Sequence, residues 1–125
     1  MKKFFVIFVM VIAMTMGLVG QAFANDIQDV DNESIETVAK FDYLIRNFEF
    51  VVNNHSECDE FTLISQRIFK DECVNNEGIY QDYVWEVTVY NRELNAYDTQ
   101  VMWIGTGERL DDLIEVIDQL SSEIW

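Results

Sequence analysis

The most informative absences in this sequence are those of proline, histidine and basic residues. The chain contains no proline, one histidine, two cysteines, and 8 Lys+Arg against 23 Asp+Glu. Without proline there is no proline-rich linker, and 125 residues have room for one domain with its own core. The shortage of basic residues argues against binding of nucleic acid or of an anionic membrane surface, because both require clustered Lys and Arg.

The first 24 residues have the three parts of a secretory signal peptide. Two lysines precede an apolar run from Phe4 to about Val19, and the segment ends in Ala22-Phe23-Ala24. The run is shorter than the roughly 20 residues that span a bilayer, so we expect cleavage after Ala24 rather than the alternative, an uncleaved anchor helix. The Met-Lys-Lys start is typical of bacterial export. It predicts a periplasmic or secreted protein with no stable membrane anchor after cleavage.

Cleavage would make the chain more acidic, because the segment carries two lysines and no acidic residue. The net charge moves from −15 for the whole chain to 6 − 23 = −17 for residues 25–125. A charge of this size keeps a protein soluble, and it also attracts a cationic partner.

Two amphipathic helices are predicted, one toward each end of the remaining chain. Residues 25–33 are acidic with few apolar side chains, and we interpret them as a flexible lead-in. From Ser34 to Val52 the apolar residues recur in steps of three and four, which is typical of a helix. A second stripe of this kind follows Gly105-Thr106-Gly107, with acidic residues in its first turn.

The chain between these helices alternates between apolar and polar residues, which predicts strands. Residues 79–90 and 99–104 are expected to pair as a hairpin. Residues 60–70 fit either a helix or a strand, and we favour a strand because two strands alone make a poor sheet. The prediction is an α+β fold with one domain over residues 34–125, in the order α-β-β-β-α. An antiparallel meander would pack against the two helices.

The two cysteines present a conflict between compartment and geometry. Cysteines of an exported chain usually pair, which predicts a Cys58–Cys73 disulfide. An unbroken strand would hold them tens of ångströms apart, against about 6 Å between the Cα atoms of a bridge. The bridge therefore requires the chain to turn back near Ser65-Gln66. The alternatives are free cysteines or a bridge between two chains.

No catalytic or metal site can be assembled from the sequence. His55 is the single histidine available as a base, and it lies in a polar stretch. Zinc sites usually have two close pairs of ligands, and only His55-x-x-Cys58 resembles one. Asp29-x-Asp31-x-Glu33 begins like a calcium loop but lacks the turn glycine. We predict no catalytic residue, metal or cofactor. A small hydrolase with a carboxylate pair is the alternative, because 23 acidic side chains allow many such pairs.

Two features indicate binding instead. One is the acidic side of the last predicted helix, which comprises Asp111, Asp112, Glu115 and Asp118. The other is aromatic: if the helices cover the Tyr83/Trp85 face of the sheet, Tyr80 and Tyr90 lie on the opposite face, where a carbohydrate or a cell-envelope component can stack. The sequence predicts an exported, acidic, non-enzymatic binding domain. One concrete form is an inhibitor or immunity-type protein for a basic secreted or periplasmic protein.

Overall fold

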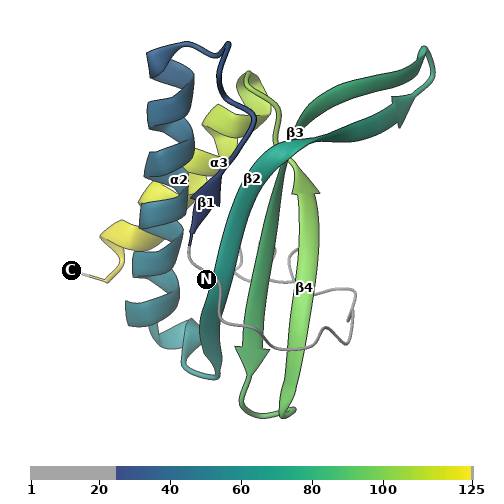
Figure 1. Cartoon of the computed structure of the whole chain (residues 1–125). Coiled ribbons are helices and arrows are strands. Elements are labelled where there is room, and N and C mark those ends of the chain that lie inside the picture. Colours follow the sequence, from purple (N-terminus) through teal and green to yellow (C-terminus); the bar gives the residue numbers. More distant parts are fainter. Residues whose placement is uncertain (1–24, 125) are drawn as a thin grey trace.

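The architecture combines a four-stranded mixed sheet with two helices, which is an α+β fold (Figure 1). The structure is a computed structural model that describes residues 25–124. The predicted signal peptide, residues 1–24, lies outside this described range. The strands follow the order β1-β2-β3-β4 across the sheet, and both helices lie on the same side of it (Figure 1).

Three strands form an antiparallel meander, as the alternating pattern predicts. They are β2 (Phe61–Asn75), β3 (Gly78–Asn91) and β4 (Ala96–Trp103). The ambiguous stretch at 60–70 is therefore a strand. A β-bulge shifts the register between Leu63 and Ser65 on β2, close to the point where a disulfide would require a reversal.

A fourth strand corrects the predicted lead-in. Residues 25–33 contain the two-residue strand β1 (Asp26–Ile27), which pairs in parallel with β2. Ile27 and Val30 pack against the core, so this stretch is docked on the domain. The sheet is mixed rather than purely antiparallel.

The helices begin and end close to their predicted positions. Helix α2 (Ile35–Asn54) starts at Ser34, whose side-chain oxygen accepts a hydrogen bond from the Thr37 N–H at 3.1 Å. Helix α3 (Glu108–Ser122) begins after Gly107, with Glu108 and Asp111 in its first turn. These carboxylates favour the positive end of the helix dipole.

The core lies between the helices and the inner face of the sheet. Phe48 of α2 packs edge-on against Trp85 of β3, with ring centroids 4.9 Å apart. Gln66 of β2 is fully buried beside them and links three elements. Its Nε2 donates to the Ile45 carbonyl of α2 at 2.9 Å, and its Oε1 accepts from Trp85 Nε1 at 3.0 Å. A one-residue slip would carry Gln66 to the other face, so these bonds fix the register of β2 against β3.

The β2–β3 hairpin continues beyond the core as a projecting arm, which we define as residues 71–82. It bends away from the helices and ends in a tight turn (Figure 1). None of its residues is buried. At the turn, Gly78 has φ of +125°, a conformation that glycine adopts without a steric penalty.

The structure contradicts the predicted Cys58–Cys73 disulfide, because both cysteines are free. Cys58 ends the 3₁₀ turn η1 (Ser56–Cys58) and is buried, whereas Cys73 lies on the arm. The 15-residue strand β2 begins shortly after Cys58, runs without a reversal and carries Cys73 near its far end. At about 3.3 Å per residue, it holds the two thiols tens of ångströms apart.

Candidate functional site

The strongest candidate site is a shallow hollow between the two helices, which we call the α2–α3 groove. Its volume is about 360 Å³. The side chains that line it come from both helices and are Glu36, Ala39, Lys40, Tyr43, Asp111 and Ile114. Spacings of three and four residues place each set on one face of its helix. The groove therefore follows directly from the packing of α2 against α3.

Two hydrogen bonds connect the helices beside this groove. Lys40 Nζ donates to Asp111 Oδ1 at 2.8 Å, and the Tyr43 hydroxyl donates to Asp118 Oδ1 at 2.6 Å. Further along, the ring Nε2 of His55 lies 3.0 Å from Glu123 Oε1. In each successive contact both partners lie further along the chain, so α2 and α3 run in the same direction.

The electrostatics keep the basic and phenolic groups protonated. The hydrogen bond to Asp111 raises the pKa of the Lys40 ammonium, and the charges of Asp111 and Glu36 act in the same direction. The hydrogen bond to Asp118 raises the pKa of the Tyr43 phenol. Glu36 also lies 3.7 Å from Lys40 Nζ. The groove thus has an apolar floor, and the two carboxylates at its rim, Glu36 and Asp111, share the ammonium of Lys40.

The structure places two of the four predicted acidic residues at the groove and two away from it. All four are exposed on α3. Asp111 lines the groove and Asp118 borders it through Tyr43, whereas Asp112 and Glu115 do not line it. The contribution of α2 was missed, although Glu36, Lys40 and Tyr43 share one polar face at positions i, i+4 and i+7.

The predicted aromatic face also forms. Tyr80, Tyr90 and Trp103 lie on the side of the sheet away from the helices, because Tyr83, Trp85 and Met102 point into the core. These rings already have partners. The Arg109 guanidinium lies 5.2 Å from the Trp103 ring centroid, and Trp103 Nε1 donates to Asp82 at 2.9 Å. The rings of Tyr90 and Tyr97 lie 4.9 Å apart.

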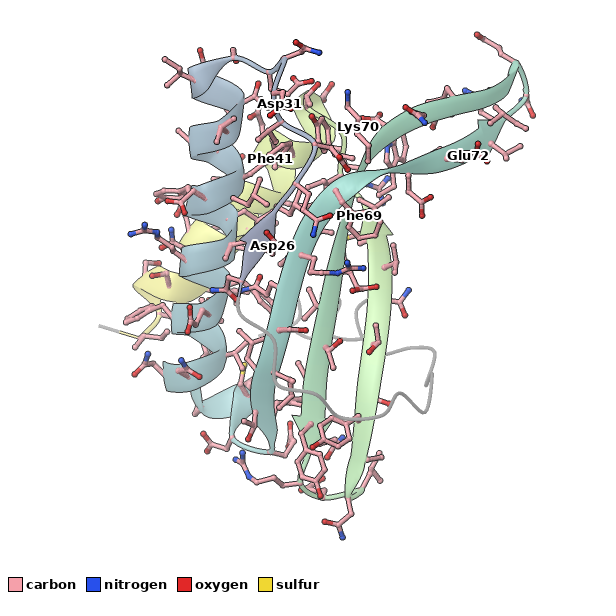
Figure 2. All side chains as sticks on the ribbon, viewed as in Figure 1. Asp26, Asp31, Phe41, Phe69, Lys70 and Glu72 are labelled. Atoms are coloured by element: carbon pink, nitrogen blue, oxygen red, sulfur yellow. The ribbon has the colours of Figure 1, made fainter. Side chains whose placement is uncertain are left out.

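A second, polar hollow of about 310 Å³ lies at the base of the arm. Its lining includes Asp31, on the loop before α2, and Lys70, on β2, both labelled in Figure 2. Asp29 also borders it, and its carboxylate accepts the Lys70 backbone N–H at 3.3 Å. Among residues 25–124, no group of three or more His, Cys, Asp or Glu is arranged to hold a metal ion.

A raised carboxyl pKa, which a carboxylate-pair hydrolase needs, occurs at Glu60. Burial raises its pKa, as do the neighbouring charges of Glu93 and Asp59. Glu60 lies just before β2 and lines neither of the two hollows described above. The carboxyl with the raised pKa therefore lies outside both hollows.

The comparisons with known proteins find no matching family model, no similar curated protein and no similar solved structure. Neither helix within residues 25–124 has both the length and the apolar character needed to cross a membrane.

Proposed function

We propose that this protein is an exported, non-enzymatic binding domain that holds a basic protein or peptide in the α2–α3 groove. The observation that supports the proposal is an apolar floor with carboxylates at its rim. Ala39, Tyr43 and Ile114 supply apolar surface. Glu36 and Asp111 supply two negative charges, of which the Lys40 ammonium between them balances one. A lysine or arginine side chain matches this arrangement, because its stem packs on apolar atoms while its head reaches the carboxylates.

The charge of the whole chain supports the same partner. Residues 25–125 carry 6 − 23 = −17, and a charge of one sign accelerates the encounter with a cationic protein. Export to the periplasm or the medium would follow from the predicted signal peptide. An inhibitor or immunity-type protein for a basic exported enzyme is one concrete form of this function.

The test uses residues 25–125 and a synthetic peptide of arginine and leucine, with fluorescence anisotropy at low salt as the readout. Ala39→Lys fills the groove and adds a cation without removing any hydrogen bond. We expect it to weaken binding about tenfold, which corresponds to about 1.4 kcal/mol. Asn53→Lys is the matched control, because it adds the same charge at an exposed position near the end of α2.

The control should bind with nearly the affinity of the original chain. If the two variants lose affinity equally, the attraction comes from net charge alone and the groove is not the site. A glutamate-for-arginine version of the peptide should not bind. Its binding would also contradict the proposal.

A further inference from the structure

The arm leaves one backbone edge of β3 unpaired, at a place separate from the groove. β3 pairs with β2 along its whole length, but its pairing with β4 begins only at Val84. β4 ends at Trp103, and the chain then turns at Gly105, where φ is +62°, and enters α3. Among the described residues, no strand pairs with the arm segment of β3 on that side.

The open edge has a defined set of hydrogen-bonding groups. The Tyr83 carbonyl accepts from the N–H groups of Ile104 and Gly105, at 3.1 and 3.2 Å. Tyr83 therefore directs its backbone toward the β4 side. Since backbone groups alternate between the two edges of a strand, Gln81 and Ile79 direct theirs to the same side. An unpaired edge of this kind is a template for an added strand.

The exposed apolar side chains of the arm lie on one face. Val74 and Ile79 lie directly opposite each other there, with 76% and 70% of their surfaces exposed, and Glu72 lies opposite Gln81 on the same face. On the other face, Asp71 lies directly opposite Asp82. Like charges in opposed positions repel each other, and a cation beside them relieves this repulsion.

The acidic residues decide which kind of partner fits. The arm carries Asp71, Glu72, Glu77 and Asp82 and no basic residue. Figure 2 shows Glu72 on the arm, with Lys70 nearer the sheet. A second copy of this arm would bring four more carboxylates to the same edge, which disfavours pairing between copies. A basic segment has the complementary charge.

We infer that the β3 edge of the arm binds an extended basic segment of a partner protein by strand addition. The added strand runs antiparallel to β3 and continues the line of β4. Its apolar side chains lie beside Ile79, on the face that Ile79 shares with Val74. Its basic side chains alternate with them and lie beside Asp82 and Asp71.

The test uses a fluorescent peptide of about eight residues in which lysine alternates with valine. A peptide residue opposite Gln81 has its side chain on the same face as Gln81 and exchanges backbone hydrogen bonds with it. In the inferred complex the valines take these positions. N-methylation of the valines removes the N–H groups that face the arm. Because each lost bond is worth roughly 1 kcal/mol, we expect affinity to fall about tenfold or more. N-methylation of the lysines alters groups that face solvent, so affinity should stay within about twofold.

Two chain variants separate this site from the groove. Replacement of residues 72–81 by Asn-Gly removes the edge and should abolish binding of the lysine–valine peptide. Ala39→Lys should leave it unchanged. Three results would each overturn the inference, whatever the groove experiment shows. They are equal losses of affinity with both methylated peptides, undiminished binding by the shortened chain, and no binding by the original chain.

Discussion

Cys58 and Cys73 occupy opposite environments at the residue scale. Burial raises the pKa of the Cys58 thiol, and the nearby charges of Glu60, Asp59 and Glu57 raise it further. Because the thiolate is the reactive form, Cys58 should be inert in the folded chain. We expect iodoacetamide to modify Cys73 alone under native conditions and both cysteines in urea, as measured by mass spectrometry.

Single-cysteine variants provide the control for this prediction. Cys73→Ser should take no label until it unfolds, whereas Cys58→Ser should label as fast as the original chain. A chain that takes no label in urea until a reductant is added would instead carry the intramolecular disulfide.

Tyr83 makes the free energy of unfolding depend on pH in the alkaline range. Its hydroxyl donates to the Asp29 carbonyl at 2.6 Å, and burial, followed by nearby acidic groups, raises its pKa from 10.0 to about 12. Between these values the folded state keeps a proton that the unfolded state has lost. The free energy of unfolding therefore falls as pH rises through this window.

Tyr83→Phe isolates this effect. The variant lacks the hydroxyl, so it should be less stable than the original chain at about pH 9 and should lose less stability by about pH 11. Urea unfolding of both proteins at the two pH values measures the difference in stability and its change with pH. A constant difference between the two proteins across the window would show that another group titrates.

At the scale of elements, hydrophobic periodicity explains what could be predicted. Helix α2 buries one face, and every second residue of β3 from Tyr83 to Val89 lies in the core, so their apolar residues repeat with the period of the element. Ile35 fits the helical stripe but is 89% exposed, because the first residue of α2 lies beyond the end of the core. β1 was missed because a strand of only two residues is too short to carry a detectable period.

The arm and the groove show where such patterns give no information. The arm buries neither face, so its residues 71–78, which precede the predicted strand at 79–90, carry no pattern that distinguishes a projecting strand from a loop. The groove depends on how far α2 and α3 are rotated toward each other, and this rotation is set by packing. The predicted disulfide was wrong because it rested on the oxidising compartment, and the compartment says nothing about the distance between two cysteines.

The arm should be dispensable for folding. Asp71 and Asp82 are directly opposite in register, so a two-residue Asn-Gly turn can join them in place of residues 72–81. Because none of the removed residues is buried, we expect the free energy of unfolding to change by less than about 1 kcal/mol. Urea denaturation measures it, and a loss of several kcal/mol would show that the arm supports the core.

At the scale of the whole molecule, unbalanced charge is the main feature. With 23 acidic side chains and 8 Lys+Arg, two of them in residues 1–24, repulsion opposes the folded state. Salt screens this repulsion, so the melting temperature should rise by a few degrees between about 10 and 300 mM NaCl. Glu77→Gln combined with Glu93→Gln removes two exposed charges and should reduce the rise. A flat salt response would contradict this view.

The bonds of Gln66 have a consequence for how this protein can evolve. They lock the hairpin register inside the core, at the Gln66–Val87 pair, whereas the tip of the arm follows the Asn75–Gly78 pair. If two residues are inserted or deleted in each strand, every remaining side chain stays on its original face of the hairpin. The same short turn can then close the shorter or longer hairpin. The arm can therefore change its reach and its side chains while the fold is inherited intact. Divergence among descendants of this chain should concentrate there.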